Sequence, residues 1–189
     1  MTETYQATSD ANLNPVSLHY LAADGKKTAK TIDANFKKGK MIGSAVENGK
    51  TTKLNTAVPE GVFLSSALYY LMLRSKEGLK TDSKFDFSAI TEEGPVIMTG
   101  TAAVDKKLVT QGSLQLLKIK NSFAGSDYEN LVTNRGEVVS AVTNATSIET
   151  VLVKSSDEAL EGIKLTAGTL EKIFGDVPAG KINVYQPKK

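Results

Sequence analysis

Apolar and polar residues alternate along most of the chain, and this period of two predicts short β-strands separated by turns. Between Thr31 and Phe36, for example, Ile32, Ala34 and Phe36 fall on one face. Asp24-Gly25 and Asn48-Gly49 predict tight hairpins, because both central residues of a type I′ turn need positive φ. Further strands are expected at residues 16–21, 41–47, 51–58, 84–90, 96–104, 107–110, 113–123, 128–133, 137–142, 148–153 and 181–185.

The period changes to that of a helix between Glu60 and Lys76. Leu64, Leu68, Leu71 and Met72 follow the spacing i, i+4, i+7 and i+8 of one helical face. Other apolar residues widen this stripe almost around the axis, so the helix is expected to be packed on two sides or to cover the open face of a sheet. The sequence therefore predicts one main helix over 60–76.

One expected strand shows a change in its apolar phase. Between Ser113 and Phe123 the apolar phase switches from Leu114 and Leu116 to Leu117 and Ile119, which predicts a β-bulge.

Near the end of the chain, Ser155 and Glu158 form a capping-box pattern that predicts a short helix. Residues 169–174 are expected to add another helical turn.

Many short strands around one helix predict a mainly β fold. An antiparallel meander of this length is expected to curl into a barrel or half-barrel, with helix 60–76 packed on its concave side. The length of 189 residues suits one domain, and no linker or repeat divides it. We therefore expect a single β-rich domain over residues 1–189.

Composition removes several classes of function. The chain has no Cys and one His, so thiol nucleophiles, thiolate metal sites and imidazole metal clusters are excluded, and neither a metal nor a cofactor is expected. A net charge of +2 is too small for a nucleic-acid or anionic-membrane footprint.

No part of the sequence resembles a membrane or targeting segment. The longest apolar run, from Ala67 to Leu73, is far shorter than the ~18 residues that a membrane span needs. No apolar segment follows Met1, so neither a signal peptide nor a transit peptide is expected within this sequence. Both a cytosolic start and a chain whose leader has been removed fit this pattern.

One string near the start imitates a phosphate-binding loop. The segment from Gly43 to Thr51 approaches the pattern G-x-x-x-x-G-K-[ST], but five residues separate its glycines instead of four. The residues after it are β-branched and strand-like, whereas a phosphate loop opens a helix. A hairpin at Asn48-Gly49 is therefore the preferred interpretation.

The remaining polar candidates give no catalytic set. His19 is isolated, and no G-x-S-x-G motif supplies a nucleophile for it. Glu92, Glu93, Asp82 and Asp86 could suggest a glycosidase pair, but all lie near expected strand ends and are interpreted as solvated loop charges. We therefore predict that the protein is not an enzyme.

A group of apolar and aromatic residues allows two interpretations. Such side chains can fill the core between a helix and a sheet, or they can line an apolar pocket, because small barrels either fill with side chains or hold one small ligand. The candidate pocket residues are Leu64, Leu68, Tyr69, Leu71, Phe85 and Phe87.

The order of features resembles a known class of domain. A helix rich in Leu and Tyr is followed by Phe85-Asp86-Phe87, then by Thr133-Asn134-Arg135-Gly136-Glu137-Val138, and finally by a segment from Leu152 to Ala159. This order resembles the uncharacterised β-rich domain of bacterial envelope proteins that is often found just before transglutaminase-like domains. The resemblance implies an extracytoplasmic location and a non-catalytic accessory role, and the transglutaminase Cys is absent here.

A weaker similarity is to the half-barrels of lipoprotein-carrier proteins, in which helices cover a curved sheet. The leading hypothesis is a non-catalytic bacterial cell-envelope domain that binds a partner protein or an apolar ligand. The alternative is a lipid or lipoprotein carrier with an apolar cavity under the helix. A periplasmic or otherwise exported location is expected, and a cytoplasmic one stays open.

Overall fold

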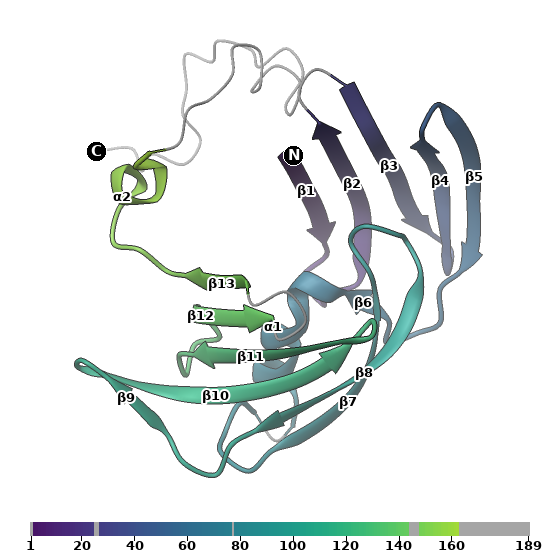
Figure 1. The fold of residues 1–189 in the computed structure, drawn as a ribbon. Helices are drawn as coiled ribbons and strands as arrows, with labels where there is room; N and C mark the ends of the chain where they lie inside the picture. Colours follow the sequence, from purple (N-terminus) through teal and green to yellow (C-terminus); the bar gives the residue numbers. More distant parts are fainter. Residues whose placement is uncertain (1, 25–26, 77, 144–147, 163–189) are drawn as a thin grey trace, which may run out of the picture. The chain divides into compact units, whose positions relative to one another are not determined.

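The computed structural model describes residues 2–24, 27–76, 78–143 and 148–162, and most of them lie in antiparallel strands (Figure 1). The chain divides into two compact units, residues 1–152 and residues 153–189. Unit 1 contains a five-stranded sheet, in the order β1-β2-β3-β4-β5, and an eight-stranded sheet. The second sheet has the order β13-β12-β11-β10-β8-β7-β6, and β9 pairs with β10.

The strands of the first sheet are β1 (Thr2–Ser9), β2 (Pro15–Asp24), β3 (Lys27–Lys37), β4 (Lys40–Glu47) and β5 (Lys50–Ala57). Those of the second are β6 (Phe63–Leu64), β7 (Lys84–Ile90), β8 (Ile97–Val104), β9 (Val109–Gln111), β10 (Leu114–Phe123), β11 (Ser126–Val132), β12 (Val138–Thr143) and β13 (Ile148–Val151). The helical elements are the 3₁₀ helix η1 (Ser65–Ala67) and the α-helices α1 (Leu68–Arg74) and α2 (Ser156–Leu160).

The mainly β prediction is confirmed, and the sheets are open. Within the described residues β1 and β5 form the edges of the first sheet, and β13 and β6 form those of the second. Of the two expected forms, the half-barrel therefore describes these open sheets better than the closed barrel. One pairing departs from the antiparallel expectation, because β6 and β7 run parallel.

Turn chemistry explains the first sheet. Asn48 and Gly49 have φ values of 50° and 78°, so the predicted β4–β5 hairpin is confirmed and the phosphate-loop interpretation fails. Asp24 pairs with Lys27, so the expected antiparallel pairing of β2 with β3 is confirmed, but Asp24 belongs to β2 and is not a central residue of the turn. Residues 25–26 lie outside the described part.

The first strand was not predicted from the sequence. β1 is polar at most positions, but Tyr5 pairs with Tyr20 in the middle of β2. Tyr5 and Ala7 are the apolar members of its inner face, and they pack against the core of this sheet. The strand is therefore defined by its partner and not by its own apolar pattern.

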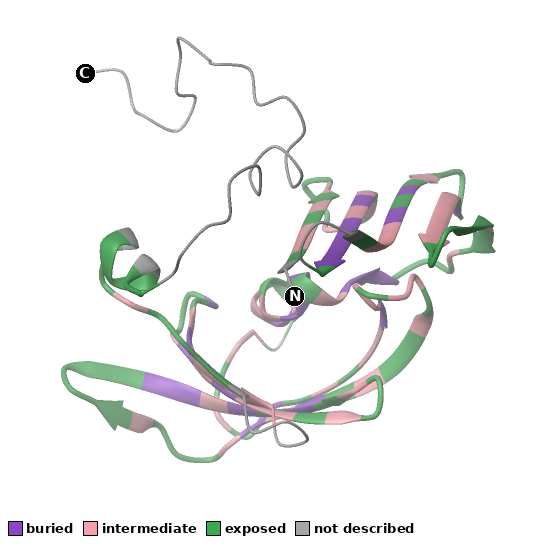
Figure 2. Cartoon of the chain, turned by 45° about the horizontal axis from the view of Figure 1, so that its top comes forward, coloured by how far each residue is buried: buried purple, intermediate pink, exposed green. Residues whose placement is uncertain are grey.

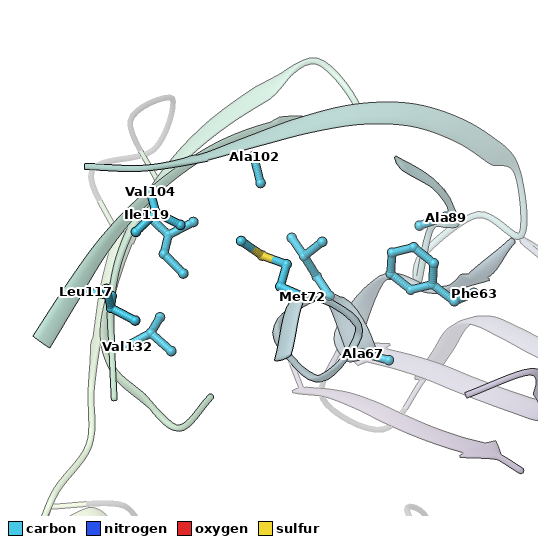
Figure 3. Packing of buried hydrophobic residues seen from close by; sticks show 10 residues of the cluster. Phe63, Ala67, Met72, Ala89, Ala102, Val104, Leu117, Ile119 and Val132 are labelled. Carbon is cyan, nitrogen blue, oxygen red and sulfur yellow. The ribbon is translucent and has the colours of Figure 1, made fainter. Parts of the chain in front are cut away.

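The eight-stranded sheet curves around α1, as Figure 2 shows. Helix side chains fill the concave face, where the buried Met72 points toward Ala102, Val104 and Ile119 (Figure 3). The predicted position of the helix is thus confirmed. The buried members of this core are Phe63, Ala67, Leu68, Met72, Ala89, Ala102, Val104, Leu117, Ile119 and Val132.

The main helix is much shorter than the expected range of 60–76. Gly61 has a φ of 82° in a turn, and Phe63 and Leu64 pair in parallel with Ala89 and Ile90. Sheet pairing therefore takes residues that the helical period had assigned to the first turns of the helix. At the other end Ser75 leaves the helical conformation, and its Oγ donates to the carbonyl oxygen of Met72 at 2.7 Å.

The bulge predicted within 113–123 is also wrong. The pairing of β10 with β11 keeps one register from Leu117 to Phe123. The phase switch instead coincides with a change of partner, because residues up to Leu116 pair with β9. Leu116 and Leu117 are consequently both buried although they point to opposite faces.

A second core joins the first sheet to the segment that leads into the helix. Leu18, Ile32 and Met41 on β2, β3 and β4 belong to the same buried cluster as Leu64 and Ile90 on β6 and β7. Leu64 thereby faces a different core from Met72, although both were placed on one helical face.

In the second unit, the described residues end at 162, just after α2. Ser155 is its N-cap and accepts a hydrogen bond from the backbone N–H of Glu158 at 3.2 Å, which confirms the predicted helix start. The helical turn expected at 169–174 and the strand expected at 181–185 lie outside the described residues. The single domain over 1–189 stays a prediction.

Candidate functional site

A pocket of about 560 Å³ lies in unit 1 beside the start of α1. Its walls come from η1 and α1, from β7 and the loop after it, and from β10 and β11. The volume falls within the range of small-molecule sites. The lining residues are Ser65, Ser66, Leu68, Tyr69, Phe87, Thr91, Glu92, Glu93, Gly94, Asn121, Phe123, Ala124, Ser126, Tyr128 and Asn130.

Three of the six pocket residues predicted from the sequence line this pocket, namely Leu68, Tyr69 and Phe87. Leu71 and Phe87 line a second, more open hollow of about 680 Å³.

The other two predicted pocket residues lie elsewhere. Leu64 is buried in the core of the first sheet, and Phe85 packs against the core around α1. The predicted residues are thus divided between two hollows and two cores. Leu64 is separated from the others because it belongs to β6 and not to the helix.

Aromatic rings form the apolar wall of the pocket. Phe87 and Phe123 lie side by side, with ring centroids 5.6 Å apart and planes tilted by 37°. The ring centroids of Phe63 and Phe87 are 5.8 Å apart. Gly100 on β8 makes room for this arrangement, because a Cβ there would come within 2.5 Å of the Phe87 ring.

A buried amide pair forms part of the polar wall. Asn130 on β11 donates from Nδ2 to Oδ1 of Asn121 on β10 at 2.8 Å, and both side chains are at least nine-tenths buried. The Tyr69 hydroxyl donates to the same Oδ1 at 3.4 Å. Burial raises the pKa of Tyr69, so this hydroxyl keeps its proton.

The sequence interpretation of Glu92 as a solvated loop charge is wrong. Glu92 is half-buried, and its Oε1 accepts a hydrogen bond from Ser65 Oγ at 3.3 Å. Burial raises the pKa of Glu92, the Ser65 hydrogen bond opposes this, and the negative charge of Glu93 adds to it. Glu93 itself is exposed.

Glu92 also influences Tyr5, a half-buried tyrosine of the first sheet. Burial raises the pKa of Tyr5 to about 12, the nearby Ser66 hydroxyl lowers it, and the charge of Glu92 raises it further. Sequence reasoning considered Glu92 but not its burial, and it missed Asn121 and Asn130, because polar residues in a turn or on a strand carry no signal of burial.

His19 lies outside this pocket, on the first sheet. Its Nδ1 is 2.6 Å from Oδ1 of Asp33, directly across β2 and β3. Ser44 on β4 is paired with Asp33, so the carboxylate stands between the serine and the imidazole. A serine nucleophile needs the imidazole next to it, and this order of residues does not provide that contact.

Other kinds of site were sought in the part of the chain that the structure describes. There, no group of three or more His, Cys, Asp or Glu side chains could hold a metal ion. The described helices are all too short or too polar to cross a membrane.

Comparison with known proteins finds a related fold and no related sequence. No protein-family model and no curated protein matches the sequence. A solved structure, the beta-barrel-like protein of domain of unknown function DUF1849 from Brucella abortus, has a TM-score of 0.55 and 13% identity over 78% of this chain and 68% of that one. The chain therefore shares its β-rich, barrel-like fold with an uncharacterised bacterial domain.

Proposed function

We propose that this chain is a non-catalytic binding domain and that the pocket beside α1 holds a small ligand with an apolar body. The observation that carries this proposal is the pocket itself, which joins an aromatic wall to a few buried polar groups. Small-molecule sites commonly have this composition.

Within the described part of the chain, His19 contacts Asp33 and no nucleophile, which supports a binding role over catalysis. A bacterial cell-envelope location belongs to the proposal, and the bacterial source of the similar fold is compatible with it. Fractionation of cells that express the chain from its own gene tests this location, and recovery in the cytoplasm would contradict it.

The neutral fluorescent probe N-phenyl-1-naphthylamine tests the pocket directly. We expect saturable binding at one site per chain, because the aromatic wall accepts an apolar ring system. Ser126 lines the pocket at the start of β11, so Ser126→Trp should abolish binding by filling it. The matched control is Ser113→Trp, an exposed position outside the pocket, which should bind normally.

Binding that survives Ser126→Trp would contradict the proposal. The carrier alternative has its own outcome in the same study. It requires that the purified protein release a lipid on extraction with organic solvent, as detected by mass spectrometry. Met72 occupies the concave face beneath the helix, where the carrier would need its cavity (Figure 3).

A further inference from the structure

All formal charges that line the pocket beside α1 are negative. Glu92 and Glu93 contribute two carboxylates, and among the described residues no Lys, Arg or His lines the pocket. A hollow with apolar walls and charges of one sign concentrates ligands of the opposite sign. The pocket therefore attracts cations and repels anions.

Among the described residues, none with a positive charge forms an ion pair with Glu92. Its hydrogen-bond partner is the neutral Ser65 hydroxyl. Holding a half-buried carboxylate without a cationic partner is unfavourable. A positively charged ligand would supply this partner.

The buried amide pair gives an independent indication. Asn130 is 4% exposed, and its Nδ2 is used by Asn121. Its Oδ1 accepts no hydrogen bond from the described residues and is not a sealed atom, so a ligand in the pocket that Asn130 lines can reach it. A carbonyl oxygen that faces a pocket can accept a hydrogen bond from a ligand, and an ammonium group has three donors and no acceptor.

The aromatic wall adds a third attraction. Tyr69, Phe87, Phe123 and Tyr128 line the same pocket as the two carboxylates. The face of an aromatic ring attracts a cation that lies within about 6 Å of its centre. The rings can thus contact either the apolar body of a ligand or its charged end.

We propose that this pocket selects organic cations, with a protonated amine directed to Glu92 and Asn130 and an apolar body against the rings. This inference rests on the proposed binding function and names the chemical class of its ligand.

Three probes that share one ring system separate charge from size. They are 1-naphthylmethylamine, 1-naphthylmethanol and 1-naphthoate, titrated calorimetrically into the full chain at neutral pH and low salt. We expect the amine to bind about tenfold more tightly than the alcohol, and the carboxylate to bind most weakly.

Glu92→Gln tests the charge that carries the argument. It should remove most of the preference for the amine over the alcohol. Glu60→Gln is the matched control, because it removes the same charge at an exposed glutamate outside this pocket. Circular dichroism establishes that each variant is folded.

The outcomes separate this inference from the proposed function. Equal affinity for amine and alcohol, or an amine preference that survives Glu92→Gln, would overturn the cation selectivity and leave the binding function standing. Failure of every probe to bind would overturn both.

Discussion

Gly100 is a residue whose missing side chain shapes the site. A Cβ there would meet the Phe87 ring at 2.5 Å and the Ser122 carbonyl oxygen at 2.8 Å. Real Cβ atoms do not approach so closely, so Phe87 or the β8–β10 pairing would have to shift. A glycine in a strand can mark such a close approach.

We therefore expect Gly100→Ala to lower the free energy of unfolding by about 1–3 kcal/mol. Gly94→Ala is the control, because a Cβ at Gly94 meets nothing within 4 Å. Urea denaturation followed by circular dichroism measures both variants. Equal stability of the two would show that the strands yield without cost.

Glu92 should make stability depend on pH in an unusual direction. Its pKa is raised in the folded chain, mainly by burial, so folding favours the protonated acid. The resulting stabilisation is present below the pKa of the unfolded chain and is lost as the pH rises through the raised folded pKa. Besides burial, the Ser65 hydrogen bond and the charge of Glu93 act on the pKa of Glu92, and Glu92 in turn acts on Tyr5 and Tyr20.

Glu92→Gln should consequently stabilise the protein at neutral pH by at most about 1 kcal/mol, since the group is only half-buried. The gain should disappear below the unfolded pKa of glutamate. Thermal unfolding at acidic and neutral pH measures this, and a variant that is less stable at neutral pH would contradict the expectation. If Glu92→Gln is more stable at neutral pH, as expected, Glu92 is a group retained for binding at a cost in stability.

At the scale of elements, α1 is held by two buried side chains, Leu68 and Met72, of which Met72 is the less exposed. Met72 is 1% exposed and packs on the concave face of the second sheet. Met72→Ala should lower the free energy of unfolding by about 2–5 kcal/mol, because it leaves a cavity there.

Tyr70→Ala, on the same helix, provides the comparison. Tyr70 is 54% exposed, so its removal should change the free energy of unfolding by about 0.5 kcal/mol or less. Chemical denaturation of both variants decides the matter, and a similar loss in each would mean that the helix is held by more than its buried side.

Several elements were predictable because their signals are local. The alternation at Lys84–Ile90 identified β7, and Asn48-Gly49 identified the β4–β5 turn from backbone chemistry alone. β1 and β6 depend on distant partners, Tyr20 and Ala89 among them, and no local pattern announces such pairings.

The same distinction holds for the candidate site. Leu68, Tyr69 and Phe87 were predicted as pocket residues because aromatic and aliphatic residues cluster near the helix. Asn121 and Asn130 meet only when β10 and β11 pair, and their burial follows from the tertiary structure. Polar members of a site could therefore not be found from the sequence.

For the whole molecule, both core clusters and the pocket lie within residues 1–152. We expect a chain that ends at Leu152 to keep its β-sheet circular dichroism, its unfolding midpoint and its affinity for N-phenyl-1-naphthylamine. Loss of cooperative unfolding in this shortened chain would instead support a single domain over 1–189.

The parallel pairing of β6 with β7 has a consequence for the order of folding events. Phe63 and Leu64 pair with Ala89 and Ile90, and α1 lies between these two strands in the sequence. The seven residues of α1 are too few to persist as an isolated helix in water. We therefore predict that the helix docks after the rate-limiting barrier, so that substitutions in α1 accelerate unfolding and hardly slow refolding in stopped-flow measurements.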